Sequence, residues 1–112
     1  MSERAPVPPF TAEHERLRLE MRAFVEERLR PHADEWEEAH WFPNEAFTWV
    51  ADAGYLGLGF TDRVAAAVWV EELARCGSGG VAAGLGAHSG IALPPIATFG
   101  SEDQKERYLT AG

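Results

Sequence analysis

The sequence predicts an all-α fold, a compact bundle of about five to six helices, and three observations support it. Apolar residues recur at helical spacing along most of the chain, and capping residues or glycines stand at the ends of these segments. The one candidate strand, residues 64–70, contains three consecutive alanines, which disfavour a strand. With 112 residues, 46% of them hydrophobic, the chain fits one domain with one core. We expect that domain at residues 11–112, after a disordered leader at residues 1–10 with three prolines.

The first helix is predicted to begin after Thr11, a suitable N-cap. Arg22 and Glu26 are four residues apart on its outer face, where they can pair. Pro31 lacks the amide donor, so it should break or kink the helix, and a separate turn or short helix should follow to about Glu38. One face carries the apolar stripe Leu17, Met21, Phe24, Val25 and Leu29.

The next two helices are predicted on either side of a glycine-containing turn. One runs from Asn44 to about Ala53 and stops at Gly54. The other is capped by Asp62 and ends at Gly77. The expected buried residues are Phe47, Val50 and Ala51 on the first helix and Val64, Val68, Trp69 and Leu73 on the second. The aromatic residues expected to fill the core nearby are Trp41, Phe42, Trp49, Tyr55 and Phe60.

A neutral segment, residues 76–101, contains no Asp, Glu, Lys or Arg. Its many small residues and the Pro94–Pro95 pair make insertion into a membrane unfavourable, so we do not expect a membrane span. We expect a helix from about Gly79 to Ala92, buried in the bundle or facing an apolar ligand. The last helix should begin with the capping box Ser101–Gln104 and extend through Leu109.

Charge and cysteine content limit the possible partners and compartments. The net charge of −8 opposes binding to a nucleic-acid backbone or to anionic lipid. The lone Cys76 excludes a disulfide framework and favours a reducing, cytoplasmic setting, and its place at a helix end without a nearby histidine predicts an inert thiol.

The short motifs with possible chemistry predict no catalytic residue, metal ligand or cofactor-binding residue in this chain. The Gly77–Ala82 segment has the letters of a dinucleotide fingerprint, but a helix rather than a strand precedes it. The four histidines lack the spacing of zinc ligands. Glu71 and Glu72 are neighbours on a helix, so their side chains diverge and one should face water.

Four segments in order carry a family resemblance: Gly54–Leu58, Glu71–Arg75, Ala87–Ser89 and Phe99–Leu109. The series resembles the N-terminal helical domain of the acyl-CoA dehydrogenases. The resemblance implies an enzyme in which a glutamate removes the α-proton of an acyl-CoA while FAD accepts the β-hydride. It places the flavin-binding domain and the glutamate beyond this region. We therefore expect the chain alone neither to bind FAD nor to be active.

The resemblance also implies partners and a site. The partners would be acyl-CoA and the remaining domains or a partner subunit, and exposed apolar surface predicts an oligomer. The predicted acyl-pocket lining is Ala83, Ala87, His88 and Ile91, with ordinary core packing as the alternative for each. The Pro/Gly-rich turn that the family usually has after the Gly-x-x-Gly segment does not follow Phe60 here, so either it is deleted or residues are missing from this sequence; a deletion would change the edge of the pocket. The alternative functions are a non-catalytic helical interaction module and an apolar-ligand carrier.

Overall fold

The computed structural model describes residues 5–110, and these residues contain helices and no strand. Five continuous helical runs and one short 3-10 turn, Leu58–Phe60, make up the architecture, so the predicted all-α fold is confirmed. Residues 5–11 precede the first helix without helical structure, and Phe10 packs against the core. Residues 1–4 of the expected leader lie outside the described residues.

The first run contains α1 (Ala12–Phe24) and α2 (Ala33–Ala39), joined by a π turn at Val25–Leu29 and a 3-10 turn at Arg30–His32. Thr11 caps α1 as predicted, in a capping box with His14. The predicted stripe is confirmed, with Met21, Val25 and Leu29 buried and Leu17 and Phe24 half-buried against the core. Pro31 lies in the 3-10 turn, so its missing donor changes the helical hydrogen-bonding pattern without ending the run.

α3 (Glu45–Asp52) and α4 (Arg63–Leu73) match the next two predicted helices. Asp62 caps α4 by accepting hydrogen bonds from the amides of Val64 and Ala65. The α4 stripe is buried except for the half-buried Val64. The expected burial of Ala51 is wrong: it is exposed, because Ala46 and Val50, one turn apart, form the inward face of α3.

α5 (Gly79–Ala87) continues through a π turn at His88–Ala92 into α6 (Leu93–Phe99). The expected helix end at Ala92 is therefore wrong. Pro94 and Pro95 stand in the first turn of α6, and the π turn before them shifts the hydrogen-bond register, which accommodates the missing amides. The helix begins at Gly79 as predicted, with Ser78 as its N-cap.

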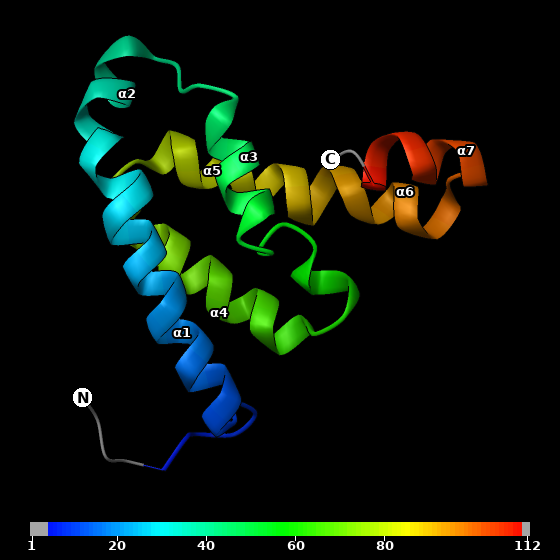
Figure 1. Ribbon diagram of the computed structural model, residues 1–112, viewed down its shortest axis with the longest axis horizontal. Helices are drawn as coiled ribbons and strands as arrows, with labels where there is room; N and C mark the ends of the chain where they lie inside the picture. The colour runs from blue at the N-terminus through cyan, green and yellow to red at the C-terminus, as the bar shows by residue number, and fades with distance from the viewer. Residues whose placement is uncertain (1–4, 111–112) are drawn as a thin grey trace.

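α1 packs most extensively on α4, and the continuous α5–α6 run, residues 79–99, which we call the α5–α6 rod, extends away from this bundle to α7 (Figure 1). α7 (Glu102–Lys105) and the π turn Glu106–Thr110 fold back beside α6, after the predicted Ser101–Gln104 capping box. Phe99 on this arm is 86% exposed. Within residues 5–110, no helix is long and apolar enough to cross a membrane.

Candidate functional site

A buried carboxylate joins α4 to α1. Glu72 is only 2% exposed, and its oxygens accept hydrogen bonds from Arg22 Nε at 2.8 Å and from Arg18 at 3.1 Å. Burial tends to raise the pKa of Glu72, but the hydrogen bonds and positive charges of Arg22 and Arg18 outweigh it and hold that pKa below its usual value. Glu71 faces solvent, as predicted for one member of the pair.

Sequence reasoning missed this ion pair because it placed Arg22 with Glu26 on the same helix. In the structure Arg22 instead reaches Glu72 across the α1–α4 interface. The signal in the sequence was the position of Arg18 and Arg22, each directly after a residue of the apolar stripe. Arginines bordering a buried stripe can extend to a carboxylate on the packed neighbour.

Two other polar contacts fix the ends of helices. Nδ1 of His14 accepts from the Thr11 amide at 3.0 Å, so Nε2–H donates to Asp62 at 2.8 Å and links the first turns of α1 and α4. This hydrogen bond, with others from backbone amides, lowers the pKa of Asp62. The Glu37 carboxylate accepts a hydrogen bond from the Ser78 hydroxyl, and this bond joins α2 to the start of α5. The same hydrogen bond lowers the pKa of Glu37.

A cavity of about 480 Å³ lies between α4, the 55–60 loop and the α5–α6 rod. We call it the α4–α6 cavity. This volume is within the range of small-molecule sites, about 300–1,000 Å³. Its walls are the loop residues Tyr55, Leu56, Leu58, Gly59 and Phe60, the α4 residues Arg63, Ala66, Trp69 and Val70, and Gly86, Ser89, Gly90, Pro94, Ala97 and Thr98 of the rod.

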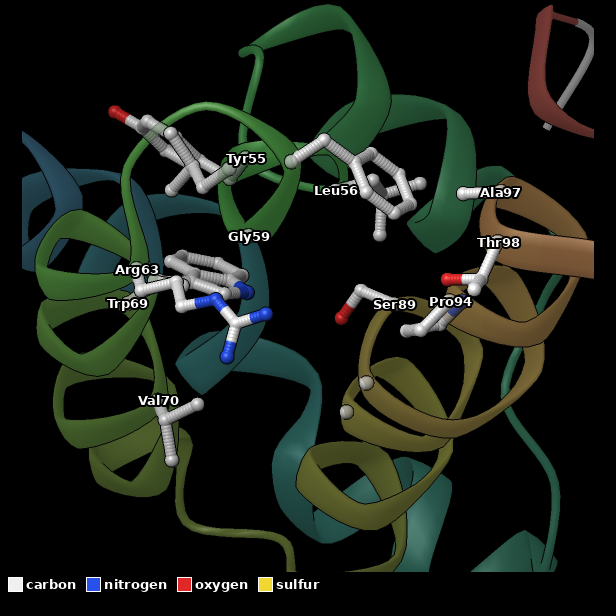
Figure 2. Close-up of a pocket in the computed structure, with 15 residues that line it drawn as sticks. Tyr55, Leu56, Gly59, Arg63, Trp69, Val70, Ser89, Pro94, Ala97 and Thr98 are labelled. Carbon is white, nitrogen blue, oxygen red and sulfur yellow. The ribbon is translucent and has the colours of Figure 1, made fainter.

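The polar groups of the cavity come from both sides. Figure 2 shows Arg63 and Trp69 projecting from α4, opposite Ser89 and Thr98 on the rod. The Ser89 hydroxyl donates to the Leu85 carbonyl at 3.2 Å, which leaves its oxygen as an acceptor toward the cavity. Among the described residues, the wall contains no Asp or Glu, and Arg63 is its one charged residue.

The four predicted pocket residues lie on the neutral segment but outside the lining of this cavity. Ile91 is 73% exposed, Ala83 is exposed and Ala87 is half-buried. These three form a partly exposed stripe beside the cavity wall. His88 is half-buried and meets the edge of the Phe47 ring at 5.3 Å between centroids.

The aromatic residues expected in the core have mixed positions. Tyr55 is buried and stacks obliquely on Trp69 at 4.9 Å, and burial raises the pKa of its phenol. Phe42 and Trp49 are half-buried. The expectation is wrong for Trp41, which is 65% exposed on the loop after α2, and for Phe60, which is 46% exposed because it stands at the cavity rim.

Two further predictions concern reactive or metal-binding groups. Cys76 is buried at 1% exposure, and its thiol donates to the Ser78 carbonyl at 3.3 Å. Burial and this hydrogen bond are consistent with the predicted inert thiol. In the part of the chain that the structure describes, no group of three or more His, Cys, Asp or Glu side chains could hold a metal ion.

Comparisons with known proteins identify related chains. The family model for the acyl-CoA dehydrogenase N-terminal domain matches residues 11–111. A long-chain specific mitochondrial acyl-CoA dehydrogenase of Sus scrofa is 33% identical over 92% of this chain and 26% of its own length. A short-chain specific acyl-CoA dehydrogenase of Clostridium acetobutylicum is 33% identical, covering 89% of this chain and 28% of its own.

A mitochondrial isovaleryl-CoA dehydrogenase of Bos taurus is 34% identical over 87% of this chain and 25% of its own length. The chain thus spans about a quarter of the length of these relatives. No solved structure matches it.

Proposed function

Since the chain belongs to the acyl-CoA dehydrogenase family, we propose that it is the N-terminal helical domain of an FAD-dependent enzyme that oxidises acyl-CoA thioesters. The observation that carries this proposal is the match of residues 11–111 to that domain. The acyl-CoA substrate and the flavin-bearing remainder, in one polypeptide or a partner subunit, are the partners this function requires.

We assign the neutral rod to one wall of the acyl pocket. A wall without carboxylates suits an alkyl chain. Burial of each CH₂ group contributes about 0.8 kcal/mol to binding, and an unpaired charge in the wall would disfavour that binding. The α4–α6 cavity offers space on one side of the rod, and the partly exposed stripe continues the apolar surface on the next side. The proposed pocket therefore still includes Ala83, Ala87, His88 and Ile91, with the stripe covered by the rest of the enzyme.

The described residues do not fit FAD. The glycine-rich segment Gly77–Ala82 follows a helix and lacks the strand of a dinucleotide site. The start of α5 is also occupied, because the Glu37 carboxylate accepts from Ser78 and from the Gly80 amide at 3.4 Å. A phosphate would meet that negative charge. We propose that the flavin is held by the remainder of the enzyme, so no chemical step is assigned to this chain.

Location and assembly follow less directly from the family. A cytoplasmic location stays a prediction, because the relatives from Sus scrofa and Bos taurus are named as mitochondrial enzymes. Self-association also stays a prediction. It is motivated by the large apolar side chains exposed on the rod and at the C-terminal end, Ile91, Phe99 and Tyr108.

The pocket assignment is tested by placing a charge on the stripe. Ala87→Glu should weaken binding of hexanoyl-CoA, measured by calorimetry, because the alkyl chain would meet an unpaired carboxylate. Ala23→Glu makes the same change at an exposed position of α1 and is the control. Equal affinity of both variants for hexanoyl-CoA would contradict the pocket assignment at Ala87.

The enzyme assignment needs a separate measurement. A longer or co-purified form that contains this chain should show flavin absorbance and oxidise acyl-CoA. The interaction-module alternative predicts neither property, and the carrier alternative predicts acyl-CoA binding without flavin. Absence of both properties from every such form would count against the dehydrogenase assignment.

A further inference from the structure

The indole nitrogen of Trp69 is a buried hydrogen-bond donor without a partner among the described residues. Trp69 is 2% exposed, and Nε1 is the one such unpaired buried side-chain atom in this part of the chain. Burying a donor without an acceptor is costly, and folded proteins satisfy most such groups. An orphan donor in a ligand cavity therefore points to an acceptor that the ligand supplies.

The orientation of this donor is fixed by packing. The Trp69 ring lies between Tyr55, at 4.9 Å between centroids, and Phe24, at 6.0 Å. Both neighbours belong to the core cluster or pack against it, so the indole cannot rotate toward a backbone carbonyl elsewhere without disturbing the core. Figure 2 shows its nitrogen on the side of the ring that faces the α4–α6 cavity.

The second polar group at this wall is positive. Arg63 lines the cavity from the first turn of α4, and among the described residues it makes no ion pair with an Asp or Glu. The chain has eighteen acidic residues, yet none of those that the structure describes lies in the wall. Arg63 and Phe60 are exposed at the rim, so a ligand can displace their side chains to reach the indole.

We propose that the α4–α6 cavity is a subsite for an acyl chain that ends in a carboxylate. Trp69 Nε1–H donates to one carboxylate oxygen, and the Arg63 guanidinium neutralises the charge and donates to the other. The apolar and glycine lining accepts the methylene groups between the carboxylate and the thioester. This inference rests on the proposed acyl-CoA function and names the substrate class within it.

The test compares two acyl-CoAs of equal chain length, adipoyl-CoA with a terminal carboxylate and hexanoyl-CoA without one. The 112-residue chain is labelled with ¹⁵N-indole tryptophan, and Trp69→Phe assigns the Trp69 signal among the four indoles. We expect adipoyl-CoA to move the Trp69 signal and to bind about tenfold more tightly than hexanoyl-CoA. The exposed Trp41 indole should stay unchanged.

Two variants separate the carboxylate contact from general binding. Arg63→Gln and Trp69→Phe should each reduce the ratio of adipoyl-CoA affinity to hexanoyl-CoA affinity. Arg28→Gln removes an equal charge from an arginine that lies over Trp49 at 4.8 Å, outside the cavity, and should keep the preference. Retention of the preference in both cavity variants would overturn the proposed contacts.

The outcomes distinguish this inference from the function on which it rests. Binding of both acyl-CoAs with equal affinity overturns the carboxylate subsite and leaves the acyl-CoA function intact. Binding of neither by the 112-residue chain, with a well-dispersed spectrum, overturns the subsite, because its whole proposed wall lies in this chain. The Ala87 comparison then still tests the stripe, and flavin content and dehydrogenase activity of the longer form still decide the enzyme assignment.

Discussion

Replacing Glu72 by Gln tests whether the ion pair between α1 and α4 stabilises the domain. The substitution keeps the shape of the side chain and removes its charge. Arg18 and Arg22 would then lose the carboxylate that they both contact. Glu71→Gln is the matched control, because Glu71 is the next residue on α4, its side chain is 54% exposed, and it contacts Arg18 alone.

The expected cost follows from the burial of Glu72 and of the two arginines that donate hydrogen bonds to it. Removing one partner of a fully buried ion pair costs about 3–5 kcal/mol. The Arg18 side chain is 15% exposed and that of Arg22 is 40% exposed, so water can partly solvate the two arginines after the change. We therefore expect Glu72→Gln to lower the free energy of unfolding by about 2–3 kcal/mol, and Glu71→Gln to lower it by at most about 0.5 kcal/mol.

Thermal and urea unfolding measure both variants. In a domain of this size about 1 kcal/mol corresponds to about 4–8 °C in Tm, so Glu72→Gln should melt about 10–20 °C lower. The pKa of Glu72 is lowered by folding, so its contribution is present above the unfolded pKa and is lost as pH falls through the folded pKa. The gap between wild type and Glu72→Gln should close in acid. Equal stabilities of Glu71→Gln and Glu72→Gln at neutral pH would refute the reasoning.

Three smaller changes test local features of the helices by thermal unfolding. Gly84→Ala should destabilise the domain by about 1–3 kcal/mol because the new Cβ would lie 2.9 Å from the Phe42 ring. Gly86→Ala has open space around the new Cβ and should stabilise the domain by up to about 1 kcal/mol, and the reverse order of the two variants would contradict this packing. Ser78→Ala should cost about 0.5–2 kcal/mol because α5 loses its N-cap hydrogen bond to Val81, and no change would exclude that cap. His40→Gly should raise Tm, since His40 has a φ of 56°, and a lower Tm would show that the imidazole outweighs the strain.

The sequence predicted the helices well where a stripe and a cap occur together. Thr11, Asp62 and Ser101 each cap a helix as expected, because a capping side chain acts on amides within three residues of itself. The end of the neutral helix at Ala92 was predicted wrongly. A π turn before Pro94 is a local change of hydrogen-bond register, and residue patterns do not encode it clearly.

The spacing of apolar residues could not predict which face of the α5–α6 rod borders the cavity. A helix with apolar or small residues on every side carries no polar face to mark its orientation. The family resemblance indicated a segment but not its orientation, and the structure places Gly86, Ser89 and Gly90, rather than the four predicted residues, in the cavity wall. The unpaired indole nitrogen of Trp69 could not be predicted from the sequence either. The apolar stripe of α4 predicts that the ring is buried, but not which acceptors surround its nitrogen.

The polar contacts and the cavity occupy different parts of the fold, and this separation supports a division of roles. The buried ion pair at Glu72 and the link between His14 and Asp62 both lie across the α1–α4 interface. Among residues 5–110, Arg63 is the one charged residue that lines the cavity, and no carboxylate lines the cavity to neutralise it. A structural arginine would be expected to have a carboxylate partner, as Arg18 and Arg22 do. An arginine left without one beside an unpaired indole donor is better explained by a ligand that brings the negative charge.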